Sequence, residues 1–86
     1  MPTISLFYGV AIRMHWRDHG PPHFHAVYES FRVSIDLRTL EIIQGTLPPR
    51  ALALVLEWAS IHQGELMENW HLCAAKRAPK RIAPLN

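Results

Sequence analysis

Two adjacent prolines, Pro48 and Pro49, separate two parts of the sequence in which apolar residues recur with different periods. Before them, apolar and polar residues alternate, which is the pattern of half-buried β-strands. After them, from Leu52 to Ala74, apolar residues recur every three or four positions, as on one face of an amphipathic helix. A helix tolerates proline in its first turn, so the pair also marks where the helix begins. The chain is therefore expected to form a small antiparallel sheet followed by a helix.

The part before Pro48 predicts three to four strands. The segment 10–17 alternates, with Val10, Ile12, Met14 and Trp16 on the apolar face and Ala11, Arg13, His15 and Arg17 on the polar face. Segments 23–28 and 31–37 alternate on either side of Glu29 and Ser30, which predicts a hairpin with a two-residue loop. The segment "LEIIQG" predicts one further strand.

The helix is expected to run from about Pro49 to Ala75, either unbroken or as two segments bent near Gly64, because glycine costs about 1 kcal/mol in a helix interior. Residues 76–86 contain two prolines and four basic residues and have no period, so they are expected to form an extended tail. Together these elements predict an α+β fold of two layers, in which the sheet packs on the helix. Residues 1–75 would form the single domain. Trp16, Trp58 and Trp70 are expected in the core or at its rim.

Composition narrows the class of protein. With 86 residues, 49% of them hydrophobic, the chain can form one modest core but not two domains. Its single cysteine, Cys73, cannot form an internal disulfide and suits a reducing cytoplasm. Neither a signal peptide nor a membrane span is expected, so the predicted location is cytoplasmic, without a membrane partner. A formal net charge of +2 permits RNA or DNA as a partner without requiring it.

The segment "DHGPPHFHA", Asp18 to Ala26, places three histidines and an aspartate around one Gly-Pro-Pro turn. With a two-residue hairpin loop, His23 lies opposite Asp36 and His25 lies opposite Ser34 on the face away from the core. Opposed residues have Cβ atoms about 4.5–5.5 Å apart, within reach of an imidazole–carboxylate hydrogen bond. The sequence therefore predicts a His23–Asp36 dyad if the loop has two residues, whereas one added residue would destroy the pairing.

One interpretation of this segment is a metal site. The His-x-His pair, His23 and His25, projects both rings to one side of a strand and offers two nitrogen ligands to Zn²⁺ or a similar ion. His19, with Asp18 or Asp36, would complete a tetrahedron.

Two interpretations without a metal stay open beside it. In the first, His23 is a general base oriented by Asp36, His25 or His19 is an acid, and Arg13 or Arg32 binds an anion such as a phosphodiester. In the second, the histidines are solvated or satisfy backbone groups near the Pro-Pro corner.

Three segments, "MPTISLFYGVAIRM", "DHGPPHFHA" and "LPPRALALVLEWA" with the later "ENW", together resemble a known family. They are similar to the bacterial domain-of-unknown-function family numbered four-one-six-zero, over nearly the whole chain. The family's pattern covers Asp18, His19, Pro21, Pro22, His23 and His25. Family members more usually have an aromatic residue at position 15, so His15 is left out of the predicted site.

The resemblance implies a small bacterial protein that is often associated with a second small protein. We therefore predict one member of a two-protein toxin–antitoxin-like or regulatory module, with a cognate small protein or a second copy as partner. Its functional surface would be the histidine-rich polar face of the sheet. The alternative is a hydrolase that acts on RNA phosphodiesters, or a metal-dependent hydrolase that uses His19, His23, His25 and Asp36. The sequence leaves open whether the protein is an enzyme.

Overall fold

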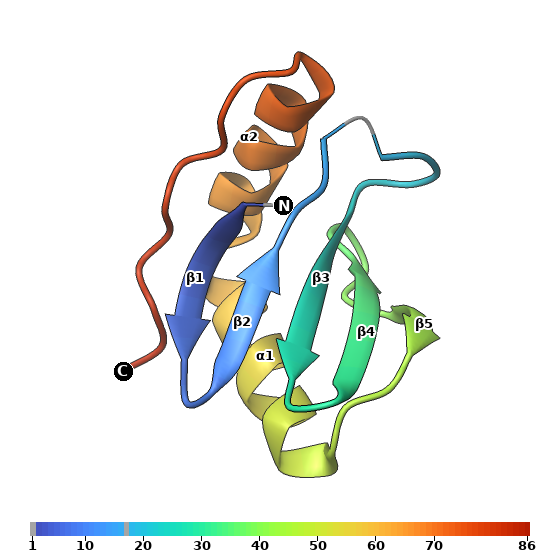
Figure 1. Cartoon of the computed structure of the whole chain (residues 1–86), viewed down its shortest axis with the longest axis vertical. Coiled ribbons are helices and arrows are strands. Elements are labelled where there is room, and N and C mark those ends of the chain that lie inside the picture. Colours follow the sequence, from blue (N-terminus) through green and yellow to red (C-terminus); the bar gives the residue numbers. More distant parts are fainter. Residues whose placement is uncertain (1, 17) are drawn as a thin grey trace.

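A computed structural model describes residues 2–16 and 18–86. Five strands come first, followed by two helices (Figure 1). The strands are β1 (Thr3–Phe7), β2 (Val10–Arg13), β3 (His23–Tyr28), β4 (Phe31–Asp36) and β5 (Ile42–Gly45). The helices are α1 (Pro49–Ile61) and α2 (Gln63–Ala74).

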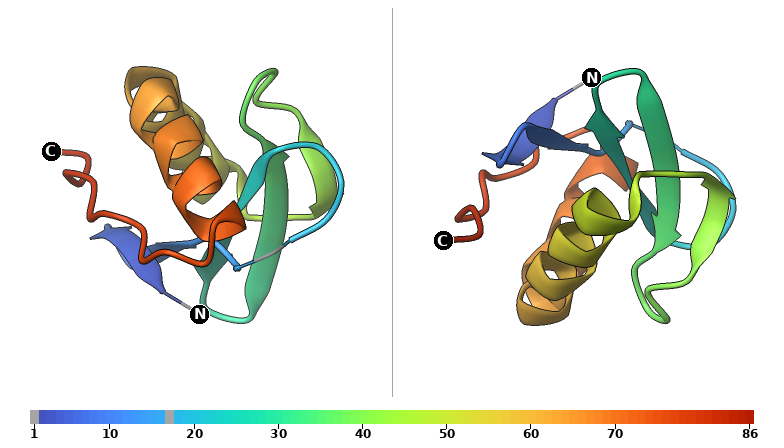
Figure 2. Two further views of the ribbon diagram at one scale, coloured as in Figure 1. Left: turned by 90° about the horizontal axis from the view of Figure 1, so that it is seen from above. Right: turned by 90° about the horizontal axis from the view of Figure 1, so that it is seen from below.

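The strands form one antiparallel sheet in the order β1-β2-β3-β4-β5, so each strand pairs with its neighbour in the sequence. Both helices lie on the same face of this sheet (Figure 2). The α+β class and the antiparallel sheet are thus confirmed. We call the face of the sheet opposite the helices the outer face. In the described chain, neither helix is long and apolar enough to cross a membrane.

The sheet has five strands, where the sequence predicts three to four. The first strand, β1, does not alternate cleanly, because a bulge lies between Thr3 and Ser5. Ile4 and Ser5 are consecutive residues, yet each is only 1% exposed. The C-terminal tail causes part of this burial, since the Ile82 N–H donates to the Ile4 carbonyl at 2.8 Å. With two consecutive residues buried, β1 does not show the alternation of a half-buried strand.

The helical part consists of two helices and not one long helix. The interruption is at His62, which has φ −115° and ψ 23° and lies two residues before Gly64. The His62 N–H still donates to the carbonyls of Trp58 and Ala59, and the Leu66 N–H donates to the His62 carbonyl. Only one residue leaves the helical conformation, and α2 continues the column begun by α1 (Figure 1).

The hairpin of β3 and β4 has the predicted register. Tyr28 pairs with Phe31 across the two-residue loop, and the pairing continues to His23 opposite Asp36. Phe24, Ala26, Val33 and Ile35 are consequently buried in the core. This register fixes which side chains of the hairpin reach the outer face.

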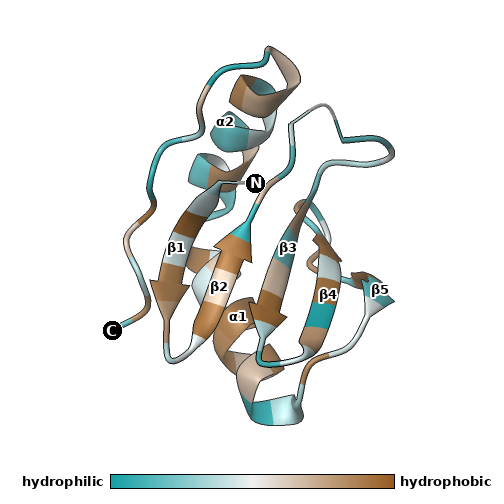
Figure 3. Cartoon of the chain, viewed as in Figure 1, coloured by the Kyte–Doolittle hydropathy of each residue, from teal (hydrophilic) through white to brown (hydrophobic). Residues whose placement is uncertain are grey.

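The core lies between the sheet and the helices, and its largest fully buried side chain is Trp58 of α1. Hydrophobic residues follow the strands and α1, whereas α2 is more hydrophilic (Figure 3). The rings of Phe7 and Phe24 contact Trp58 at centroid distances of 5.4 Å and 6.1 Å. Trp16, expected in the core or at its rim, is 55% exposed, because β2 ends at Arg13 and the chain leaves the sheet before residue 16.

Residues 76–86 run alongside β1 without forming a strand (Figure 1). Ile82 is buried, and the Trp58 indole N–H donates to the Ala83 carbonyl at 2.8 Å. The side chain of Asn69, which is 1% exposed, makes two hydrogen bonds of 2.8 Å to the backbone of Lys80. The tail thus covers one edge of the sheet, while β5 forms the other edge (Figure 1).

Candidate binding site on the outer sheet face

Three histidines and one aspartate meet where β2 and β3 join the loop between them, and we call His15, Asp18, His23 and His25 the histidine–aspartate cluster. One carboxylate oxygen, Asp18 Oδ2, lies 2.9 Å from His23 Nε2 and 3.1 Å from His25 Nε2. The rings of His15 and His25 stack with their centroids 3.9 Å apart. The His23 ring also contacts Trp70 of α2, at a centroid distance of 5.3 Å. The cluster therefore lies at the end of the sheet that is nearest to α2.

The two histidines of β3 differ in how many ring N–H groups their hydrogen bonds require. His23 Nδ1 donates to the Pro21 carbonyl at 2.8 Å, while its Nε2 faces the Asp18 carboxylate. Both neighbours are acceptors, so His23 makes both bonds only as the imidazolium cation. His25 Nδ1 lies 3.1 Å from Ser34 Oγ, and this hydroxyl can donate or accept. His25 can therefore be neutral and still bond to Asp18 and Ser34.

The surroundings of the cluster shift two pKa values. Burial alone would raise the pKa of the Asp18 carboxyl, but hydrogen bonds from His25 and from the His19 backbone, with the nearby histidine charges, lower it overall. Burial lowers the pKa of His15, and the neighbouring His25 lowers it further. Asp18 is therefore held as the carboxylate, and His15 is held as the neutral ring.

Three members of the cluster lie close enough together to hold a metal ion. One ligand atom from each of His15, Asp18 and His25 lies within 4.8 Å of the other two. Of the predicted ligands, the structure brings together Asp18, His23 and His25. His19 is exposed, and its recorded contact with the cluster is through the backbone, whose N–H donates to Asp18 Oδ1 at 3.0 Å.

His15 is the site residue that sequence reasoning left out. The family's preference for an aromatic residue at this position argued against it, although the alternation of segment 10–17 places His15 on the same face as Arg13. Arg13 pairs with His25 in the sheet. The alternation was therefore the signal that could have identified His15, which lies beside His25 on the neighbouring strand.

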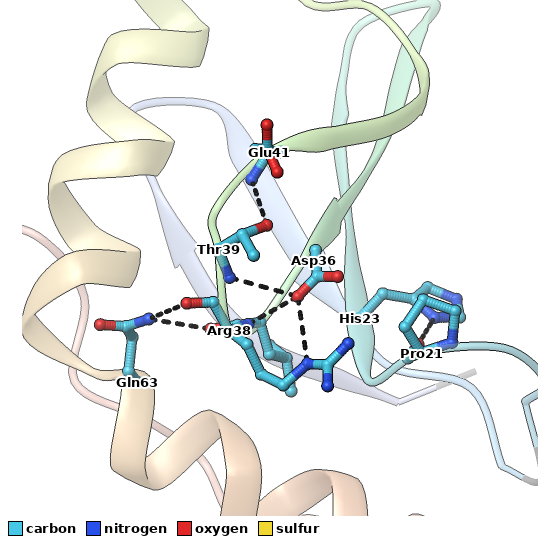
Figure 4. Close-up of polar contacts among 8 residues, drawn as sticks. Pro21, His23, Asp36, Arg38, Thr39, Glu41 and Gln63 are labelled. Carbon is cyan, nitrogen blue, oxygen red and sulfur yellow. Dashed lines mark hydrogen bonds and ion pairs between the residues drawn. The ribbon is translucent and has the colours of Figure 1, made fainter.

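Asp36 lies opposite His23 in the register, but its carboxylate turns to the following loop (Figure 4). Asp36 Oδ1 accepts the backbone N–H groups of Arg38 at 2.7 Å and Thr39 at 3.2 Å. These bonds, the one from Arg38 first, lower the pKa of Asp36. Among the described residues, no hydrogen bond or ion pair joins the side chains of His23 and Asp36. The predicted His23–Asp36 dyad is therefore not formed.

An open cavity of about 310 Å³ lies beside the cluster on the outer face. Arg13 and Arg32, the two predicted anion-binding residues, both line it. Arg13 Nε is buried and has no hydrogen-bond partner among the described residues. The other lining residues are His15 of the cluster and residues of β3, β4 and β5, namely His25, Val27, Val33, Ser34, Gln44 and Gly45. The cavity can therefore offer two guanidinium groups to an anionic ligand.

Comparison with known proteins identifies a family but no reaction. The family described as "Domain of unknown function (DUF4160)" matches residues 9–71 of the chain. The match covers the whole cluster, the cavity and most of both helices. No curated protein and no solved structure was found to match.

Proposed function

The chain belongs to the DUF4160 family, and we propose that it is the binding module of a two-protein, toxin–antitoxin-like or regulatory pair. Its functional surface is the outer face of the sheet. The ligand bound at this face is an extended acidic segment of the cognate small protein. Arg13 and Arg32 bind carboxylates of this segment, and β5 offers it an edge to pair with.

Arg13 carries the proposal. A buried guanidinium N–H without an acceptor costs on the order of 1–3 kcal/mol, so such groups normally have partners. Arg13 Nε has none among the described residues, and Arg13 lines the open cavity together with Arg32. A carboxylate in the cavity would satisfy this donor and would be held by two positive charges.

The edge of the sheet supports a polypeptide as the ligand. The tail covers β1, whereas no strand of the described chain pairs with the outer side of β5. All four residues of β5 are exposed, including Ile42 and Ile43 at 45% and 47%. An extended segment can add to such an edge through main-chain hydrogen bonds. Gln44 and Gly45 of β5 also line the cavity, so a segment added to this edge would lie beside the cavity that Arg32 lines.

The test is to co-express the chain with the small protein encoded beside it and to measure their association. We expect the two proteins to elute together in size-exclusion chromatography. Arg13→Gln and Arg32→Gln should each raise the dissociation constant about tenfold or more, because each removes a charged hydrogen bond. Arg50→Gln is the matched control, since Arg50 is exposed on α1 and does not line this cavity.

A chain that stays free of its neighbour's product, or that binds it equally well in both cavity variants, would contradict the proposal. The alternative ligand is an RNA phosphodiester, and a gel-shift and cleavage assay with total RNA measures it directly. RNA binding that Arg13→Gln abolishes, without binding of the neighbouring protein, would replace the protein partner with RNA.

A further inference from the structure

We propose that His15, Asp18 and His25 form a site for a divalent transition-metal ion, with zinc as the best match. Two imidazole nitrogens and one carboxylate oxygen are a donor set that zinc binds in proteins, with a fourth position left for water or a ligand. This inference goes beyond the proposed function, because it concerns the free chain and does not depend on the partner.

The distances in the cluster are close to those of a bound ion. Zinc at about 2.0–2.2 Å from each donor places tetrahedral ligand atoms roughly 3.4 Å apart. Asp18 Oδ2 and His25 Nε2 are already 3.1 Å apart. One donor of His15 lies within 4.8 Å of one donor of Asp18 and one of His25, so it must move closer by a side-chain adjustment of no more than about 1.5 Å. The stacking of the His15 and His25 rings already holds them side by side.

The neighbours of the three ligands suit a metal as well. Once His25 Nε2 binds an ion, its Nδ1 must carry the hydrogen and donate it. Ser34 Oγ, 3.1 Å away, can accept that hydrogen, which fixes the ring in the ligating tautomer. The Asp18 carboxylate is held from its other side, because Oδ1 accepts the His19 backbone N–H.

His23 is better placed to support the site than to ligate the ion. Its Nδ1 is engaged with the Pro21 carbonyl, and its Nε2 lies 2.9 Å from Asp18 Oδ2. His23 can therefore orient the Asp18 carboxylate by donating a hydrogen bond to it, as residues that contact metal ligands commonly do. His15 and His25 also line the cavity, so the fourth coordination position would open toward it.

The experiment is a titration of the full chain, purified without a histidine tag and treated with chelator, using ZnCl₂ and then CoCl₂ as probes. We expect one ion per chain by calorimetry and the visible absorption of tetrahedral Co²⁺. Asp18→Asn, His25→Gln and His15→Phe should each weaken affinity at least tenfold. His15→Phe retains a ring to stack on His25, and thermal melting checks that every variant is folded.

Two histidine variants serve as controls that should bind like the unaltered chain. His19→Ala removes an exposed side chain next to the cluster, and His62→Ala removes a histidine that pairs with Glu65 on the helical side. Absence of one-to-one binding would overturn the proposal. The proposal would also be overturned if His15→Phe bound zinc normally while His19→Ala did not. The ligands would then include His19 in place of His15. Because no partner is present, failure here leaves the proposed function untouched.

Discussion

Asp18 and Asp36 are two carboxylates near the same histidines, but they have different partners. Asp18 accepts from imidazole rings on β3, whereas Asp36 accepts backbone N–H groups two and three residues further along the chain. Asp18 therefore belongs to the candidate site, whereas Asp36 stabilises the turn that follows β4. The different partners make the two residues separable by mutation.

Asp36→Asn should change how stability depends on pH. Its folded-state pKa is below the ordinary value of 3.8. The carboxylate therefore stabilises the fold fully above about pH 3.8, and this stabilisation is lost as pH falls through the lower folded-state pKa. Asparagine keeps an oxygen acceptor but not the charge. Thermal melting from pH 7 to about 2.5 should show the variant less stable near neutrality and the gap closing in acid; a gap that is constant over the whole range would contradict this assignment.

The register of the hairpin could be predicted at the residue level, but the side-chain partners could not. Alternation and a two-residue loop determine that His23 lies opposite Asp36. They do not reveal that Asp36 is also the last residue before a turn, where nearby backbone N–H groups compete for its oxygen. The alternation of segment 10–17 places His15 on the face of Arg13, which pairs with His25. The family pattern misled because it was weighed above this alternation.

At the level of elements, Gly45 and Gly64 differ in whether the surrounding structure leaves room for a side chain. Gly45 has φ +84°, and a Cβ there would lie 2.2 Å from the Arg32 carbonyl oxygen. Gly64 lies in the first turn of α2, and a Cβ there would meet no atom within 4 Å. Of these two, only Gly45 is required by the fold, because it lets β5 pair closely with β4 beside the Arg32 backbone.

Gly45→Ala should lower the free energy of unfolding by about 2 kcal/mol or more, since it combines an unfavourable φ with a clash against backbone. Gly64→Ala should raise it by about 0.5 kcal/mol through helix propensity. Urea denaturation of both variants provides the comparison. Equal effects at the two positions would mean that the β4–β5 pairing is not as described.

The elements differ in how much of them the sequence could reveal. The hairpin and the helical period depend on local patterns, and these were predicted. A bend near Gly64 was one of the two alternatives for the helix, and the interruption lies at His62, two residues earlier. Strand β1 was not predicted, because the bulge between Thr3 and Ser5 leaves two consecutive residues buried and breaks the alternation.

In the molecule as a whole, the tail covers one edge of the sheet, whereas no described strand pairs with the other edge, at β5. The buried Asn69 side chain attaches the tail through both of its polar atoms. Glu68, its neighbour, also reaches the tail, but through an exposed ion pair with Lys80 at 3.2 Å. The two contacts provide a matched pair for measuring what holds the tail in place.

Asn69→Ala should lower the free energy of unfolding by about 2 kcal/mol, because it removes two buried hydrogen bonds and leaves the Lys80 backbone without its partner. Glu68→Ala should lower it by less than about 0.5 kcal/mol, as expected for an exposed ion pair. Chemical denaturation measures both, and hydrogen exchange at β1 should increase only in Asn69→Ala. If the two variants lose equal stability, the tail is not held by Asn69.

Amide chemical-shift mapping of the ¹⁵N-labelled chain, with and without the unlabelled small protein encoded beside it, most directly tests whether the outer sheet face is the functional surface. We expect the largest shifts at Arg13, at Arg32 and along β5, whereas the exposed residues of α1 and α2 should change little. Shifts confined to the helices, with the outer face unchanged, would contradict it.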